Sequence, residues 1–156
     1  MKILHSWIND FTKSGLSADA VVTALTNSGT ETSAMNIADG IDEKVVLGRI
    51  EKMIQHPGAD RLRCCEVTIG SEVKPIVCGA TNIVVGDYVA VATPGARLPG
   101  DFKIKKSKIR GEVSEGMLCS ASELELGFES DGILVWQDSA LNELLGTPLR
   151  DFIGRD

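Results

Sequence analysis

The chain has 156 residues, of which 43% are hydrophobic, 24% are charged and only 4% are aromatic. This composition is typical of a folded globular protein with an aliphatic core, and the length suits one ordinary domain with a small appendage, so a disordered chain is excluded. The formal net charge of −6 excludes a protein that coats nucleic acid with a basic surface on all sides, but it is compatible with a local phosphate-binding stripe.

The first forty residues predict two short helices. Trp7 and Phe11 recur at helical spacing in SWINDFTK, and a second apolar face runs through ADAVVTALTNSG. Ser17 is a suitable N-cap for the second helix, and Gly29 is a suitable stop. We therefore expect residues 1–43 to form an N-terminal helical segment.

From Lys44 onward the pattern predicts short strands separated by glycine-containing turns. The β-rich runs are KVVLGRIEKMIQ, RCCEVTIG, KPIVCGA, DYVAVAT, FKIKKSKIR and GILVW. Many short strands at turn-like spacing within residues 44–137 favour a compact barrel of about five strands. A helical turn is expected near 120–126, and the leucine-rich tail at 138–156 regains helical character.

The run FKIKKSKIRG at 102–111 contains five basic residues and no acidic one, so the rest of the chain carries −11. Ile104 and Ile109 would face opposite sides of a regular strand. A β-bulge at 105–106 would restore the register. The inward set would then be Phe102, Ile104, Ser107 and Ile109, and the outward set Lys103, Lys105, Lys108 and Arg110, with Lys106 on the bulge. The run is either a solubilising edge strand or a surface that attracts anions.

The four cysteines are at positions 64, 65, 78 and 119, and none has the C-x-x-C spacing of a zinc or redox site. We expect free thiols and therefore a reducing compartment. Asn9 and Asp10 interrupt the N-terminus before an apolar signal region can form, and no run is long enough to span a membrane. These features predict a cytoplasmic protein that does not enter membranes.

Two pairs of residues could suggest catalysis, but each has a simpler interpretation. His56 and Asp60 lie in HPGAD, where a proline-containing turn with Asp60 capping it or pairing with an arginine is expected. Ser114 and Glu115 have no histidine nearby in sequence, so we expect them to bond to backbone in a turn. No phosphate-binding glycine loop or other ATP motif is present.

Three longer strings are more specific than periodicity can explain. They are HPGADRLRCCEV at 56–67, IVCGATNIVVGDYVAVATPGARLPG at 76–100 and SEGMLCSASELELG at 114–127. Together they resemble the tRNA-binding OB-fold module of bacterial phenylalanyl-tRNA synthetase beta subunits, and similar modules occur in methionyl-tRNA synthetases and in free-standing tRNA-binding proteins. The opening MKILHSWINDF and the tail ALNELLGTPLRDFIG resemble the segments that flank this module in the beta subunit.

The resemblance implies a mainly β fold: a five-stranded OB-fold barrel at 44–137, with a small helical N-terminal segment at 1–43 and a C-terminal tail at 138–156 that returns to it. The parent subunit is much longer, so the chain looks like a fragment whose small N-terminal domain is incomplete and exposes apolar surface. The parent is a phenylalanine–tRNA ligase that uses ATP and magnesium at sites outside this chain. We expect no cofactor, metal or catalytic residue in this segment itself.

The implied partners are tRNA, the synthetase alpha subunit and the remaining beta-subunit domains. The expected RNA-binding residues are Arg97, Lys103, Lys105, Lys106, Lys108 and Arg110. The aromatic residues of the module are Tyr88, Phe102, Phe128 and Trp136, and with Phe102 turned inward they offer few stacking platforms, so binding should depend on phosphates. The alternatives are a structural packing module that touches little RNA, or a free-standing tRNA-binding protein.

Overall fold

The computed structural model of the chain describes residues 1, 3–126 and 132–153. These residues belong to two compact units, Met1–Asn36 and Ile37–Asp156, which are considered separately below. Within the described residues, no helix has the length and apolar character needed to cross a bilayer.

The first unit contains the two predicted helices, α1 (His5–Thr12) and α2 (Ala18–Asn27). The predicted N-cap is confirmed, because the Ser17 hydroxyl accepts a hydrogen bond from the Ala20 N–H at 3.3 Å. The predicted stop is confirmed too. Gly29 has a φ of 95°, and the N–H groups of Gly29 and Thr30 donate to the carbonyls of Thr26 and Leu25, which satisfies the last carbonyls of α2.

The first unit leaves much of its apolar side chain surface exposed, as expected. None of the eight described residues of α1 is buried, and Trp7 and Phe11 lie open to solvent. Met35, near the end of the unit, is exposed as well. Among the described residues of this unit, Val21 alone is buried.

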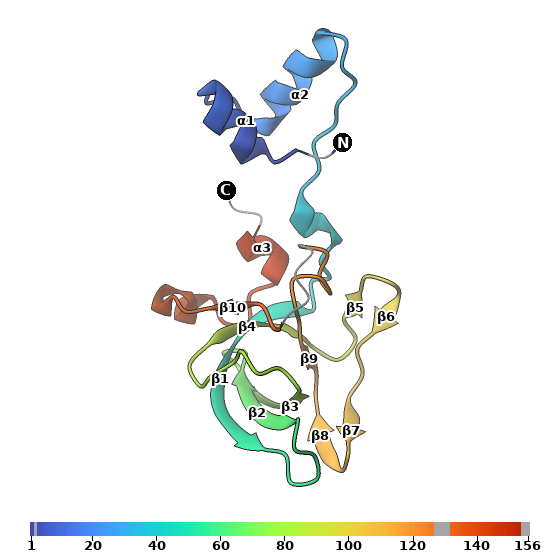
Figure 1. The fold of residues 1–156 in the computed structure, drawn as a ribbon, viewed down its shortest axis with the longest axis vertical. Helices are drawn as coiled ribbons and strands as arrows, with labels where there is room; N and C mark the ends of the chain where they lie inside the picture. The colour runs from blue at the N-terminus through green and yellow to red at the C-terminus, as the bar shows by residue number, and fades with distance from the viewer. Residues whose placement is uncertain (2, 127–131, 154–156) are drawn as a thin grey trace. The chain divides into compact units, whose positions relative to one another are not determined.

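The second unit is built on an antiparallel barrel (Figure 1). Its strands are β1 (Val45–Gln55), β2 (Arg63–Thr68), β3 (Val73–Cys78), β4 (Tyr88–Ala92), β8 (Glu112–Ser114), β9 (Met117–Leu118) and β10 (Val135–Trp136). β1 pairs with β2 and β4, and β2 pairs with β3. β8 and β9 serve as the fifth barrel strand, because they pack along β3 and β9 pairs with β4. This order is that of an OB fold and confirms the predicted mainly β, five-stranded barrel.

The barrel closes at a seam made by Ser114, Glu115 and Gly116. The Glu115 N–H donates to the Pro75 carbonyl at 2.7 Å, and the Val77 N–H donates to the buried Ser114 hydroxyl at 3.1 Å. That hydroxyl donates in turn to the Gly116 carbonyl at 3.1 Å. The prediction that these residues bond to backbone is confirmed for Ser114, and Glu115 contributes its own N–H.

Apolar residues pack on both faces of the central strands. The barrel interior includes Ile50, Val67, Ile76 and Val89. A second cluster lies on the other face of β1 and β4, where Leu149 of α3 (Leu149–Ile153) joins buried strand residues. Because both faces are covered, the first half of β1 and all of β4 are buried.

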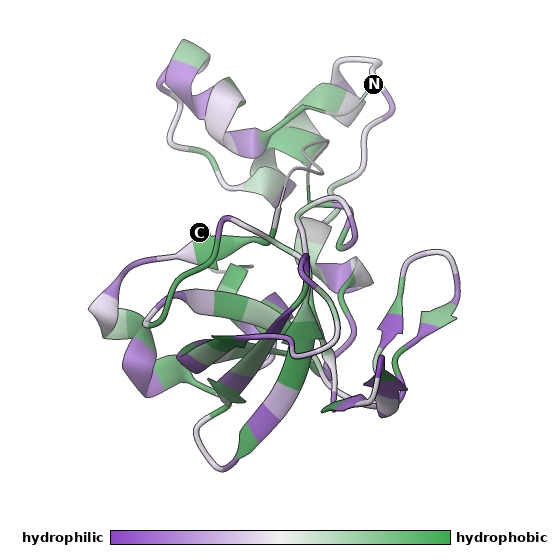
Figure 2. Cartoon of the chain, turned by 60° about the horizontal axis from the view of Figure 1, so that its bottom comes forward, coloured by the Kyte–Doolittle hydropathy of each residue, from purple (hydrophilic) through white to green (hydrophobic). Residues whose placement is uncertain are grey.

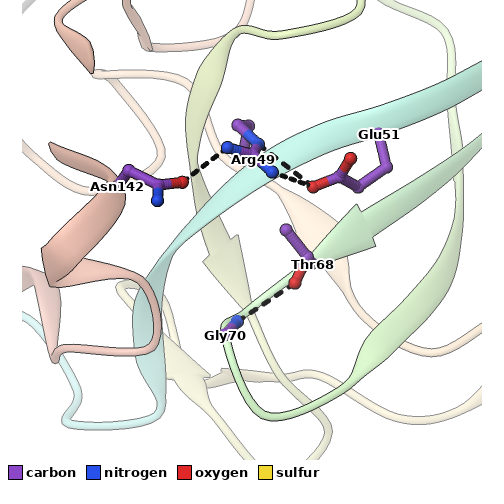
Figure 3. A network of polar contacts seen from close by, with 5 residues as sticks. All are labelled: Arg49, Glu51, Thr68, Gly70 and Asn142. Carbon is purple, nitrogen blue, oxygen red and sulfur yellow. Dashed lines mark hydrogen bonds and ion pairs between the residues drawn. The ribbon is translucent and has the colours of Figure 1, made fainter.

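The tail therefore packs against the barrel. Its 3-10 helix η2 (Ser139–Leu144) is tied to β1 by a hydrogen bond from the Arg49 guanidinium to the Asn142 side chain (Figure 3). Arg49 also forms an ion pair with Glu51, and its pKa is raised mainly by that contact. The expected return of the tail to residues 1–43 stays a prediction.

The chain between β4 and β8 differs from the predicted single bulged strand. It forms two short hairpins, in which β5 (Arg97–Leu98) pairs with β6 (Phe102–Lys103) and β7 (Ser107–Ile109) pairs with β8. The bulge prediction is wrong because the strand ends after Lys103 and pairing resumes with a new partner at Ser107. Ile104 is buried as predicted and Ile109 is half-buried, but Phe102 and Ser107 are exposed, so their inward placement was wrong.

A buried histidine joins two turns at one end of the barrel. His56 is only 2% exposed; its Nε2 lies 2.9 Å from the Ile109 carbonyl, and its Nδ1 accepts from the Gly58 N–H at 2.9 Å. The ring must therefore carry its proton on Nε2, which donates to Ile109. This links the β1–β2 turn at 56–62 to the β7–β8 hairpin. The Gln55 amide holds the same turn by donating to its carbonyls, whereas no hydrogen bond of the Asp60 side chain is found within the described residues.

Replacing His56 with alanine should destabilise the second unit by about 2–4 kcal/mol, because it leaves a cavity and two backbone groups without their partner. His56→Asn keeps a short acceptor for the Gly58 N–H and should cost less. Asp60→Ala, in the same turn, should change stability by no more than about 0.5 kcal/mol. Urea unfolding of the three variants measures this order, and equal stabilities for His56→Ala and Asp60→Ala would contradict it.

Gly116→Ala should also open the seam. Gly116 has a φ of 143°, and a Cβ there would lie 2.7 Å from the Ala92 carbonyl oxygen on β4. Gly111→Ala is the matched control, because Gly111 has a φ of 92° but open space around it, so only backbone strain is added. We expect a loss of about 1–3 kcal/mol for Gly111→Ala and a clearly larger loss for Gly116→Ala in thermal unfolding. Equal losses would show that the close contact with β4 is unimportant.

Candidate nucleic-acid interface

All six predicted RNA-binding residues lie in residues 93–111, the connection between the fourth and fifth barrel strands, which we call the basic connection. OB folds bind oligonucleotides with the loop between these strands and the loop between the first two. Here the β1–β2 turn is the second of those loops, and His56 bonds it to the basic connection. The basic residues therefore lie where this fold class presents its ligand-binding loops.

The basic connection runs along one side of the barrel, outside the main sheet (Figure 1). Arg97 and Lys103 are paired across the β5–β6 hairpin, so the structure brings them together. Lys108 lies on β7 and Arg110 at the tip of the β7–β8 turn, while Lys105 and Lys106 lie between the hairpins. All six side chains belong to exposed residues.

A tight turn presents Arg110. Ile109 pairs with Glu112, which leaves Arg110 and Gly111 as a two-residue loop with φ values of 49° and 92°. Two positive φ values are the signature of a type I′ turn, which matches the twist of the flanking strands. Arginine is an uncommon residue at a positive φ, and Arg110 is exposed at this position.

Two of the six cations have acidic partners. Lys106 forms an ion pair with Glu115 and thereby lowers the pKa of that carboxyl group. Arg97 lies 3.9 Å from Asp101, but both side chains are largely exposed, so this pair is weak. Among the described residues, Lys103, Lys105, Lys108 and Arg110 have no carboxylate within ion-pair distance. Four cations are thus available to an anionic ligand.

Asp42 positions the start of the basic connection. Its carboxylate accepts from the Lys44 N–H at 2.8 Å and from the Arg97 N–H at 3.0 Å. These backbone bonds, the one from Lys44 first, lower the pKa of Asp42. An open depression here is lined by three carboxylates and three cations, so its charges balance; they are Asp39, Asp42, Glu43, Lys44, Arg97 and Arg150. The depression is therefore a poorer anion site than the hairpins.

One aromatic residue of the barrel unit, Phe102, is placed differently from the prediction. Tyr88 is buried, and Trp136 packs edge-on against Phe152 with ring centroids 5.4 Å apart. Phe128 lies outside the described residues. Phe102 is exposed, and sequence reasoning missed it. The turn signal Pro99-Gly100 just before it could have indicated a separate hairpin.

In each residue pair considered for catalysis, the histidine or serine side chain forms hydrogen bonds that stabilise the fold. Both ring nitrogens of His56 bond to backbone groups, and the Ser114 hydroxyl is buried in the seam. All four cysteines are free thiols. Burial raises the pKa of Cys65 to about 11 and that of Cys119 to about 12, so both are unreactive near neutral pH. No group of three potential metal ligands was found in the part of the chain that the structure describes.

Comparison with known proteins agrees with this geometry. Residues 45–142 match the family model described as "Putative tRNA binding domain". The phenylalanine–tRNA ligase beta subunit of Geobacter sulfurreducens is 44% identical over 154 residues, which cover 99% of this chain and 19% of the relative. The corresponding protein of Syntrophotalea carbinolica is 47% identical over 136 residues, covering 86% and 17%.

Similarity to solved structures is lower. A MetRS related protein from Pyrococcus horikoshii has 16% identity and a TM-score of 0.49, covering 74% of this chain and 97% of that one. The chain spans about a fifth of the length of the curated relatives it matches. From its strand order and from the match over its barrel, the chain belongs to the tRNA-binding domain family and is a relative of bacterial phenylalanine–tRNA ligase beta subunits.

Proposed function

We propose that this chain is an RNA-binding module that holds tRNA during aminoacylation by a phenylalanine–tRNA ligase, as part of its beta subunit. One observation carries the proposal: the six cations lie in the loop between the fourth and fifth barrel strands, and four of them have no acidic partner among the described residues. Phosphates are the ligands that such a row of lysines and arginines attracts.

The parent protein supplies the chemistry in this proposal. It binds ATP and magnesium at sites outside this chain and pairs with the synthetase alpha subunit. Its remaining beta-subunit domains are further partners of this module. Residues 1–43 then belong to a small helical domain, 44–137 form the OB barrel and 138–156 form the tail that returns to that small domain. A cytoplasmic location is supported by the four free thiols, which suit a reducing compartment.

A structural packing role is the second candidate function. It is favoured by the charge of −11 outside the run at 102–111, which repels phosphate at long range. In that case the exposed lysines only keep the edges of the short hairpins soluble. The two roles predict different salt dependence of RNA binding.

Changing Lys103, Lys105 and Lys108 to alanine should weaken tRNA binding and make it less sensitive to salt. Four phosphate contacts predict a slope of log K against log salt of about −3 to −3.5, and removing three should shallow it by about 2 to 3. Titrations of the whole 156-residue chain with tRNA at several salt concentrations measure both quantities.

The matched control changes Lys13, Lys52 and Arg150 to alanine. It removes the same charge from exposed positions outside the basic connection, and it should lower affinity only slightly and leave the slope nearly unchanged. Equal slopes for the two triple variants would favour the packing role over RNA binding.

The 156-residue chain alone should not form aminoacyl-adenylate and should not hydrolyse mischarged tRNA. The sequence has no ATP motif, and the His56 and Ser114 side chains are occupied by backbone bonds. Pyrophosphate exchange with phenylalanine and ATP, measured beside an intact synthetase as positive control, tests this. Turnover that survives further purification of the chain would overturn it.

A further inference from the structure

The basic connection carries an exposed aromatic ring. Phe102 is 57% exposed, and among the described residues of the second unit it is the one aromatic side chain in the exposed class. The other exposed large apolar residues of this unit are aliphatic: Ile54, Val73, Val84 and Val85. A single exposed apolar residue is ordinary on a protein surface, so Phe102 is informative because of its place in the basic connection and not because of its exposure alone.

A rigid hairpin presents this ring. Leu98, directly opposite Phe102, is buried in the core, and so is Ile104, two residues further on. The Ile104 N–H donates to the Ala96 carbonyl at 2.8 Å, and the Gly95 N–H donates to the Ile104 carbonyl at 2.8 Å. The base of the hairpin is therefore fixed on the barrel. Phe102 lies toward its tip, just after a turn in which Gly100 and Asp101 have φ values of 83° and 59°.

Charged side chains flank the ring: the exposed Asp101 precedes it, Lys103 follows it, and Arg97 lies across the hairpin from Lys103. Arg97 and Lys103 form the pair next to Leu98 and Phe102, so they point to the opposite face of the two-stranded ribbon. Lys105 follows two residues after Lys103 and is also exposed. A strand of nucleic acid that crosses the hairpin edge can therefore meet the ring on one face and cations on the other.

We propose that Phe102 is a stacking platform for an unpaired RNA base, while the neighbouring cations contact the adjacent phosphates. This proposal rests on the proposed RNA-binding function and adds a class of ligand to it: single-stranded RNA segments. Bases in a duplex are already stacked on one another, so a protein ring gains a base only where the strand is unpaired. Every base has a π-face, so the contact tolerates different sequences. Charge favours RNA over an apolar protein partner as the occupant, because the run at 102–111 has five cations and no anion.

The test compares Phe102→Ala, Phe102→Leu and Phe102→Trp with the wild-type chain. The probes are a short single-stranded oligoadenylate and a blunt RNA duplex with the same number of phosphates. Alanine should weaken binding of the single strand about 5- to 150-fold, as expected for the loss of one stacked base. Leucine should weaken it nearly as much, since it keeps apolar area but no π-face, and tryptophan should retain it. The affinity for the duplex should stay unchanged, because no charge is altered. For the same reason, the slope of log K against log salt should stay unchanged for the single strand and for the duplex.

Val85→Ala is the control, since Val85 is 56% exposed and lies outside the basic connection. In Phe102→Trp, oligoadenylate should also quench tryptophan fluorescence beyond the change seen for Trp7 and Trp136 in the wild type. This signal depends on stacking and not on the stability of the alanine variant.

The outcomes separate this inference from the proposed function. If the wild-type chain binds neither probe nor tRNA, the proposed function fails. If the wild type binds but alanine or leucine at position 102 binds the single strand as tightly, the stacking inference fails while RNA binding stands. In that case Phe102 is an apolar contact for a protein surface. Absence of added quenching in Phe102→Trp would overturn the inference in the same way.

Discussion

Closure of the barrel between β3 and β4 is the constraint on which the rest of the structure depends. The Ser114 hydroxyl and the Glu115 N–H join the fifth strand to β3, and the close approach of Gly116 to Ala92 lets that strand reach β4. Once these bonds close the barrel, the core is complete without most of residues 93–111. That connection lies outside the main sheet, and its side chains are free of the core except at buried positions such as Ala96, Leu98 and Ile104.

This freedom from the core explains how an acidic chain carries a concentrated basic surface. Lysines spaced through a core strand would have to be buried or paired, whereas lysines on two short outer hairpins remain solvated. The connection still needs a fixed position if it is to bind a ligand of defined shape. His56 supplies one attachment at the β7–β8 end, and Asp42, with the buried Leu98 and Ile104, supplies another at the β5–β6 end. The basic connection thus combines exposed cations with a backbone that is fixed at both hairpins.

Local signals were enough to predict the Ser17 cap and the Gly29 stop, because each depends on residues close in sequence. The barrel was predicted from the series of short strands and from the resemblance to a known family, since its pairings join residues as distant as Val45 and Ala92. The six cations were identified correctly as exposed, since lysine and arginine are seldom buried. The inward placement of Phe102 and Ser107 was wrong, because it was inferred from in–out alternation along a single strand. The turn at Pro99-Gly100 instead starts a separate hairpin. The role of His56 was out of reach, since its partner Ile109 lies 53 residues away and only the folded barrel brings them together.

The central claim is that the basic connection and the β1–β2 turn together form the surface that contacts RNA. Mapping of backbone amide chemical shifts by NMR, on the isotope-labelled chain titrated with tRNA, tests it most directly. The account predicts that the largest changes fall at residues 93–111 and 56–62, with small changes in the tail and on the covered outer face of β1. Changes confined to Met1–Asn36 or to the tail, or no changes at residues 93–111 when tRNA is bound, would contradict it.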